Sequence, residues 1–392
     1  MRKIWLSMLA GAALGLAILA PAQAQDVVKI GQIEAQTGPA SIYGFLTAQG
    51  TKLAVQQVNQ AGGFDVAGKK YKFELYSPDT QASPQQALIQ IKKSLEQDKA
   101  KYVFGPTLSN VYNGVRDYVK DYNGKILMLA PATAAHPDIG KPGFEFLMRP
   151  VVFDTAPAGF GTWMVDYLKK KGVKKVAFLW QNDAAGKFVA GLYDEPFAKA
   201  GIEVQSHWFE PNTKDYSAVL AKIAAWKPDY LAPGYTDGVL FDIIRQATQV
   251  GLTKFWLVRG SLGPGMANKD ALDEYIIYMP KYFQEAEKTD PKVAKFIKEY
   301  NEFFKVKEFP YDLASVIYAA SYDHVFMLIE AMKKAGTVDD VAAVKKALLS
   351  ITYNGLWTQK FDSMGGGIHS YEIAELRRGG ALKLNLVKPG DQ

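Results

Sequence analysis

Short β-forming runs alternate with longer amphipathic segments in two successive series, and this alternation constrains the fold more than any other feature. The first series runs from Val28 to Pro150 and the second from Thr155 to Pro280. A repeated strand-helix-strand order favours a parallel sheet with helices on both faces. The sequence therefore predicts two doubly wound, Rossmann-like α/β lobes. They share a layout without shared residue identity, unlike the short, regular repeats of a solenoid.

The expected strands are VKIGQI, YKFELYS, YVFG and KILMLA in the first series and KKVAFLW, IEVQSHWF, YLAPGY and YIIYMP in the second. The expected helices span 43–60, 84–97, 111–120, 155–170, 187–200 and 216–226.

Beyond Pro280, the segments 291–304, 313–334 and 338–349 have helical patterns, and two short strands follow within IAELRRGGALKLNLV. We expect these elements to return to the first lobe. Repeated crossings form a multi-strand hinge, which permits bending around a cleft. The predicted division is 25–150 for the first part of lobe one, 151–280 for the main part of lobe two, and 281–392 for the return segments, hinge and C-terminal strands.

The first 24 residues have the order of a secretory signal peptide. Arg2 and Lys3 precede an apolar run that ends at the small-residue pattern Ala22-Gln23-Ala24. The run is short for a membrane span. We expect residues 1–24 to be cleaved and the mature protein to lie in the periplasm. Because the chain has no cysteine, we expect no lipid anchor and no disulfide.

Several functional classes lack their signatures. The 46 Lys and Arg residues against 40 Asp and Glu are too balanced and too dispersed to indicate nucleic-acid binding. The chain has neither the glycine-rich phosphate loops nor the G-x-S-x-G elbow of serine hydrolases. Its four histidines lack ligand spacing, and His324 has the pattern of a packed helix residue, whereas His136 lies in a loop. We therefore expect no catalytic residue, no cofactor and no metal.

Six loops follow expected strands, where parallel sheets present helix N-termini to ligands. They are EAQTGPASIYG, GPTLSN, APATAAHPD, QNDAAGK, PGYTDG and RGSLGPG. Small residues and hydroxyls predominate in them, with isolated aromatics at Tyr43 and Tyr235, which is typical of a snug binding cleft. Both tyrosines also suit packing between lobes.

The chain resembles the periplasmic ligand-binding proteins of the branched-chain amino acid (leucine/isoleucine/valine) family, which serve ABC transporters. The resemblance covers essentially the whole mature chain and rests on VKIGQIEAQTGPASIYG, NQAGGFDVAGKKYKFELYSPDTQASPQQA, YVFGPTLSN, ILMLAPATAAHPD, the Pro150 region and YDHVFMLIEAM. It implies the type I periplasmic-binding fold, whose lobes close like a clamshell on a small solute that a membrane permease then receives. We expect a monomer that performs no chemistry.

The resemblance also implies a carboxylate site on the first lobe. Ser109 matches the hydroxyl residue that contacts the ligand carboxylate in the family's amino acid binders. The backbone amides that complete this site fall at Ala132 and Ala134, on either side of Thr133. The family's second hydroxyl is replaced here by the methyl group of Ala134.

On the second lobe, two of the three ligand-binding side chains that the resemblance implies are missing. The tyrosine is present as Tyr235, whereas the acid that pairs with the ligand ammonium is Gly260 and an aromatic is Ala185. A buried ammonium without an anion costs several kcal/mol, so free amino acids should not be preferred. Asp183 and Asp237 are alternative partners for an ammonium.

Arg259 ends the buried strand pattern KFWLV directly before Gly260. Its guanidinium either faces an anionic ligand or points away, because neighbours on a strand face opposite sides. With the space left at Gly260 and Ala185, these features favour a flat or elongated organic acid without an α-amino group, and an aromatic carboxylate above others. Alternatives are an amino acid or amide ligand, a periplasmic sensor module for a signalling receptor, and a periplasmic enzyme acting on an organic acid.

Overall fold

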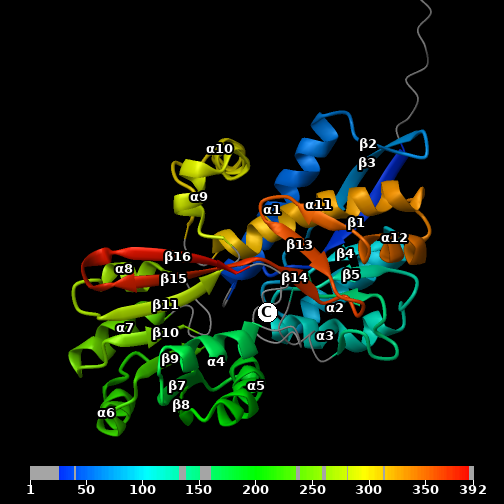
Figure 1. Cartoon of the computed structure of the whole chain (residues 1–392). Helices are drawn as coiled ribbons and strands as arrows, with labels where there is room; N and C mark the ends of the chain where they lie inside the picture. The colour runs from blue at the N-terminus through cyan, green and yellow to red at the C-terminus, as the bar shows by residue number, and fades with distance from the viewer. Residues whose placement is uncertain are drawn as a thin grey trace, which may run out of the picture.

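The structure is a computed structural model that describes residues 26–38, 41–131, 138–150, 160–234, 239–257, 262–279, 281–311 and 314–387. These residues form two α/β lobes, each with its own sheet (Figure 1). The prediction of two doubly wound lobes is confirmed. No helix within the described ranges combines the length and apolar character that a membrane crossing requires.

The first sheet has six described strands in the order β2-β3-β1-β4-β5-β6. They are β1 (Asp26–Gln32), β2 (Phe64–Val66), β3 (Lys69–Tyr76), β4 (Tyr102–Phe104), β5 (Leu127–Leu129) and β6 (Leu147–Met148). All neighbours pair in parallel except β2 and β3, which form an antiparallel pair. The connecting helices are α1 (Ser41–Gln60), α2 (Pro84–Lys92), its π-helical continuation (Lys93–Gln97) and α3 (Ser109–Lys120).

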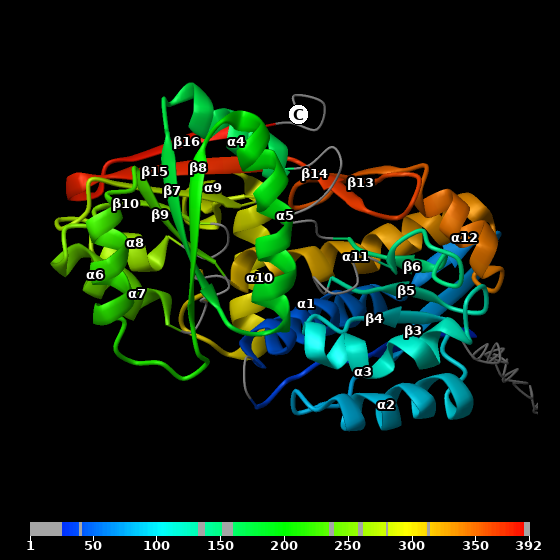
Figure 2. The same cartoon turned by 90° about the horizontal axis from the view of Figure 1, so that it is seen from below.

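Helices cover both faces of this sheet. The late helix α11 (Ala314–Ala335) lies beside α1 in both views and is followed by α12 (Val341–Leu348) (Figures 1 and 2). Side chains of α1, α11 and the strands, among them Ile30, Val55 and Leu328, form one buried cluster. A second cluster joins α2 and α3 to the sheet through residues such as Ile91 and Val115. Periodic apolar positions thus place each helix against the strands.

The second sheet has seven described strands in the order β16-β15-β11-β10-β9-β7-β8. They are β7 (Lys175–Gln181), β8 (Glu203–Phe209), β9 (Tyr230–Gly234), β10 (Lys254–Trp256), β11 (Glu274–Met279), β15 (Tyr371–Arg377) and β16 (Leu382–Val387). The helices are α4 (Phe160–Lys170), α5 (Ala184–Ala200), α6 (Ser217–Trp226), α7 (Leu240–Gln249), α8 (Gly263–Ala267), α9 (Phe283–Thr289) and α10 (Pro291–Phe304).

The two C-terminal strands belong to the second sheet, so our expectation that they return to the first lobe is wrong. β15 runs antiparallel to β11, from Glu372 opposite Met279 to Arg377 opposite Glu274, and β16 continues the sheet. The pairing buries Ile373 in the core of the second lobe. The apolar alternation predicts a strand, but it does not identify the strand's partner.

A small antiparallel sheet lies between α12 and β15 in the chain and consists of β12 (Thr352–Asn354), β13 (Thr358–Phe361) and β14 (Gly367–His369). The chain leaving β6 is bound to it, because the Arg149 amide donates to Gly365 O at 2.9 Å and the Gly367 amide donates to Arg149 O at 2.8 Å. The chain passes from the first sheet to the second after β6, returns between β11 and α11, and passes back between β14 and β15. These passages are the connections at which the two lobes can bend.

Candidate functional site

The lobes meet where the loop after β4 leads into α3. Helix α3 contacts α5 of the other lobe, and Leu108, directly before α3, packs against hydrophobic clusters of both lobes. Figure 2 shows α5 passing close to the first lobe. Ligands of open α/β sheets bind beyond the carboxyl ends of the strands, where such helices begin. This junction is therefore the candidate site.

Ser109 is the first residue of α3 and is half-buried. Leu108 precedes it in an extended conformation, and no side-chain hydrogen bond caps the helix. Unpaired amides and the helix dipole make such a helix end favourable for an anion. The structure thus places the predicted hydroxyl at an uncapped helix N-terminus beside the second lobe.

Tyr43 lies in the first turn of α1 and is buried, with 5% of its surface exposed. It belongs to the large hydrophobic cluster that contains the core of the second lobe. Its ring therefore forms part of the apolar wall between the lobes, and its carbonyl oxygen accepts a hydrogen bond from Thr47 Oγ1 at 3.0 Å.

A fully buried carboxyl group, Glu34, lies next to this junction and was not singled out by the sequence analysis. Its Oε2 accepts the Thr107 amide at 3.0 Å, and its Oε1 lies 2.9 Å from Thr107 Oγ1. Burial raises the pKa of Glu34 to about 8, against the opposing effect of the Thr107 hydrogen bonds. The sequence signal is an acid between Ile33 and Ala35 at the end of a buried strand.

The loop after β4 passes very close to this carboxyl group. A Cβ atom on Gly105 would lie 2.4 Å from Glu34 Oε1, so only glycine allows the approach. The carboxyl group therefore fixes the path of the loop that carries Ser109.

Asp183 caps α5 at the second-lobe side of the junction. Its Oδ1 accepts the Gly186 amide at 2.7 Å, and its Oδ2 accepts Gln181 Nε2 at 2.7 Å. A Cβ atom on Gly186 would lie 2.1 Å from Gln181 O, which explains the glycine in the first turn of α5. Ala185 occupies the first turn of α5 between these two residues.

Six of the predicted site residues, and Asp237, lie outside the described residues, so their roles remain predictions. The six are Ala132, Thr133, Ala134, Tyr235, Arg259 and Gly260. The described strands β5, β9 and β10 end shortly before these segments.

Within the described part of the chain, no group of three or more His, Cys, Asp or Glu residues is arranged to hold a metal ion. His324 belongs to α11 and is buried, and this burial lowers its pKa to about 3. It is therefore neutral at physiological pH, as expected for a packed histidine.

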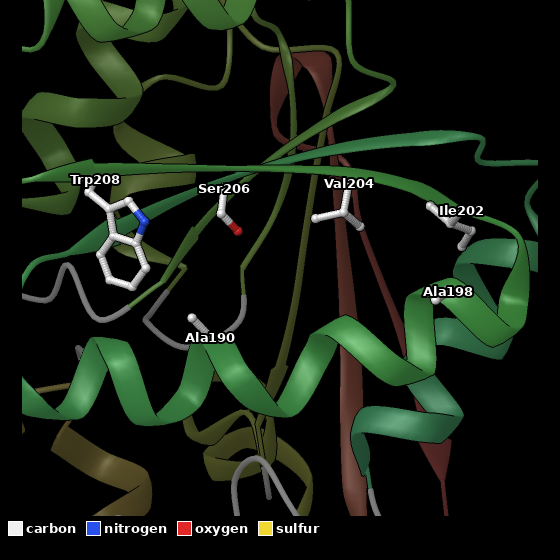
Figure 3. Close-up of a pocket in the computed structure, with 6 residues that line it drawn as sticks. All are labelled: Ala190, Ala198, Ile202, Val204, Ser206 and Trp208. Atoms are coloured by element: carbon white, nitrogen blue, oxygen red, sulfur yellow. The ribbon is translucent and has the colours of Figure 1, made fainter.

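A hollow of about 420 Å³ lies in lobe two, between α5 and β8 (Figure 3). It is lined by Ala190, Ala198, Ile202, Val204, Ser206 and Trp208. These residues come only from α5, β8 and the turn between them, so the hollow belongs to the second lobe alone.

Comparisons with known proteins agree with this architecture. Residues 27–381 match the family of periplasmic binding proteins. A Leu/Ile/Val-binding protein of Rhizobium johnstonii is 29% identical over 334 residues, which cover 82% of this chain and 83% of that protein.

Two solved structures are similar in fold. The solute-binding protein of an ABC transporter from R. palustris, in complex with benzoate, has a TM-score of 0.71 and 19% identity, covering 93% of this chain and 97% of that chain. A branched-chain amino acid transporter substrate-binding protein from Streptococcus pneumoniae, in complex with isoleucine, has a TM-score of 0.70 and 19% identity, covering 93% of this chain and 100% of that chain. One of these two similar structures therefore holds an aromatic acid and the other an amino acid.

Proposed function

Because this chain belongs to the family of periplasmic binding proteins, whose members bind small solutes for ABC transporters, we propose that its own ligand is an organic acid without an α-amino group. An aromatic carboxylate is the favoured ligand. The lobes close on it, and the closed form delivers it to the membrane permease. No chemical step is part of this function.

The observation that carries the proposal is the position of Ser109 at the uncapped N-terminus of α3. A carboxylate there receives a hydroxyl hydrogen bond and the favourable field of the helix dipole. The junction with the second lobe removes it from water on closure, which strengthens both interactions.

The absence of an amino group in the ligand is supported by the second lobe. Position 260, where the family's amino acid binders carry the acid for the ammonium, is glycine. Asp183 is committed to capping α5, since both of its oxygens already accept hydrogen bonds. A buried ammonium would therefore have neither an acid at position 260 nor an uncommitted Asp183 as its partner, which leaves Asp237 as the remaining candidate.

Binding of a branched-chain amino acid is the second candidate, favoured by the similarity to a Leu/Ile/Val-binding protein over 82% of the chain. Two matched ligand pairs separate the candidates: 3-phenylpropionate with phenylalanine, and 4-methylpentanoate with leucine. Within each pair the two acids differ in the α-ammonium group alone. Benzoate and 3,4-dihydroxybenzoate complete the panel.

Calorimetric titration and thermal shift measure binding directly, because a ligand of the folded state raises the melting temperature. We expect the ammonium-free member of at least one pair, or one of the benzoates, to bind more tightly than either amino acid. Binding of leucine and phenylalanine alone would overturn the proposal in favour of the second candidate.

Export is a separate part of the proposal. We propose that residues 1–24 are a cleaved signal peptide and that the mature protein is an unlipidated periplasmic monomer. Mass spectrometry of the periplasmic fraction should show an N-terminus at Gln25, and gel filtration should show a single-chain mass. A full-length chain in the membrane fraction contradicts cleavage, and a mass of two chains contradicts the monomer.

A further inference from the structure

Four buried residues at the lobe junction are connected by a chain of oxygen contacts. Glu34 Oε1 lies 2.9 Å from Thr107 Oγ1, which lies 3.0 Å from Thr47 Oγ1, which in turn lies 3.0 Å from the carbonyl oxygen of Tyr43. Between 0% and 7% of each residue is exposed to solvent. The chain thus connects the loop before Ser109 to the first turns of α1.

Each of these three contacts needs one hydrogen atom, because two oxygens at hydrogen-bond distance repel each other without one. The hydroxyl groups of Thr107 and Thr47 supply two hydrogens, and the Tyr43 carbonyl supplies none. An ionised Glu34 would leave one contact without a hydrogen. A protonated Glu34 supplies the third: Oε1 donates to Thr107, Thr107 donates to Thr47, and Thr47 donates to Tyr43 O.

The other carboxyl oxygen, Oε2, accepts the Thr107 amide at 3.0 Å in either state. The protonated form therefore places a hydrogen in each of the three contacts, whereas the ionised form leaves one contact without a hydrogen. Burial of a carboxylate far from water adds to the preference for the neutral form.

No ion pair involves Glu34 among the described residues. On α1, the Lys52 ammonium donates to Gln36 Oε1 at 2.6 Å. In the loop after β3, Asp79 Oδ1 accepts the amides of Gln36 and Thr37. On α11, Ser321 Oγ donates to Thr47 O at 2.9 Å and carries no charge. Lys52 and Asp79, the charged groups named here on the neighbouring elements, therefore have other partners.

We propose that Glu34 is a positioning residue, held in its neutral, protonated form, that ties the Ser109 loop to the first turns of α1 through Thr107 and Thr47. Its ionisation removes one hydrogen from the chain and loosens the loop. Ligand affinity then decreases as Glu34 ionises at alkaline pH. The link to ligand affinity rests on the proposed function, in which Ser109 contacts the ligand, whereas the protonation state does not.

The first test uses the ligand-free protein. Subtracting the infrared spectrum of the E34Q variant from that of the wild type at about pH 7 should leave the carbonyl band of protonated Glu34, because the band of any other buried acid is common to both proteins and cancels. The band should disappear by about pH 9.5 as Glu34 ionises. Its absence at neutral pH would overturn the inference.

Hydrogen exchange of residues 105–110 gives a second ligand-free readout. After correction for the intrinsic rate, protection of the Thr107 amide should fall about tenfold between about pH 6 and about pH 9.5 in the wild type, because the loss of one side-chain hydrogen bond between these oxygens loosens the loop that carries this amide. It should stay constant in E34Q, whose side-chain amide keeps a neutral donor and acceptor. Equal pH dependence in both proteins would refute the role of Glu34.

Two threonine variants distinguish the effect of the oxygen contacts from a general effect on packing. T107V removes the Thr107 hydroxyl, and with it two of the three oxygen contacts, at nearly constant volume. It should lower the protection of the residue 107 amide from hydrogen exchange at every pH. The matched control T51V removes another buried hydroxyl of α1, which donates to Thr47 O and lies outside the chain. It should leave protection of residues 105–110 unchanged, and equal losses in both variants would show a packing effect and contradict the proposal.

Affinity for benzoate is the functional readout. The dissociation constant of the wild type should increase about tenfold between about pH 6 and about pH 9.5, and that of E34Q should remain constant. Failure of benzoate and the other acids to bind at any pH would refute the proposed function, while the infrared and exchange results would still decide the state of Glu34. Binding of benzoate with the same pH dependence in E34Q would refute the coupling alone.

Discussion

The amide of Leu356 donates a hydrogen bond to Asp323 Oδ2 at 2.8 Å. Asp323 belongs to α11 of the first lobe, and Leu356 lies in the turn between β12 and β13. The carbonyl oxygen of the same Leu356 accepts Lys281 Nζ at 2.8 Å, just after the second-lobe strand β11. The small antiparallel sheet of β12, β13 and β14 is therefore hydrogen-bonded to both lobes through one residue, Leu356.

Replacing Asp323 with alanine should destabilise the protein by about 3 kcal/mol. The change leaves the buried Leu356 amide and Gln359 Nε2, which Asp323 also accepts at 3.1 Å, without this partner. D323N should cost less than about 1 kcal/mol near neutral pH, because its amide oxygen can take both hydrogen bonds. Urea unfolding measures both values. A D323N variant as unstable as D323A would contradict a neutral Asp323.

The free energy of unfolding should decrease as the pH rises from about 7 toward about 8. Burial raises the pKa of both Glu34 and Asp323 to about 8, from ordinary values of 4.5 and 3.8. In this window the folded protein binds more protons than the unfolded chain, so each group lowers stability by at most about 1.4 kcal/mol per pH unit. His324, whose pKa is lowered, is neutral in the folded protein and mostly neutral in the unfolded chain above pH 7, and contributes little there.

Urea unfolding across this window should give a shallower pH dependence for E34Q and for D323N than for the wild type, and the shallowest for the double variant. Each single variant removes one of the two titrating groups. A double variant with the wild-type slope would show that other groups carry the pH dependence.

Removing the Ser109 hydroxyl should weaken binding of the acid ligand by roughly fivefold to thirtyfold. The side chain supplies one charge-assisted hydrogen bond, worth about 1–2 kcal/mol when its partner is a carboxylate. S109A should leave the melting temperature of the ligand-free protein within about 2 °C, because the residue is half-buried at a helix end. S217A is the matched control, since Ser217 is likewise the first residue of a helix, α6. If S109A binds the acid ligand as tightly as the wild type, Ser109 does not contact the ligand.

The periodic segments of the sequence predict the lobes well because burial dictates their patterns. Helix α3, expected over 111–120, spans Ser109–Lys120, and the strand and helix order of both lobes follows the alternation. The small antiparallel sheet was not predicted, because β12, β13 and β14 are only three or four residues long and their apolar and polar residues alternate weakly. Strand partners that are distant in sequence could not be predicted either. The β11–β15 pairing depends on which edge of the second sheet is left unpaired, and local sequence does not encode this.

The candidate site shows the same division. Ser109 is predicted as a site residue through the family resemblance, whereas Glu34 has partners in Thr107 and Thr47, which are distant in sequence and converge only in the folded chain. An acid at the end of an apolar strand indicates a buried carboxyl group, but the partners of that carboxyl group are set by the tertiary structure.

Substituting aspartate for Gly260 should shift the ligand preference toward amino acids. The position corresponds by sequence to the acid that pairs with the ligand ammonium in the family's amino acid binders, so the change supplies the missing anion. The added negative charge should also repel a bulky acid that has no ammonium group. We expect G260D to weaken 3-phenylpropionate binding and to strengthen phenylalanine binding, each by about tenfold or more, as measured by calorimetry.

G260N is the control, because asparagine has the size of aspartate without its charge. It should weaken binding of the acid through its bulk alone and should not strengthen phenylalanine binding. Equal effects of G260D and G260N on both ligands would show that position 260 sets the volume of the pocket and not its charge.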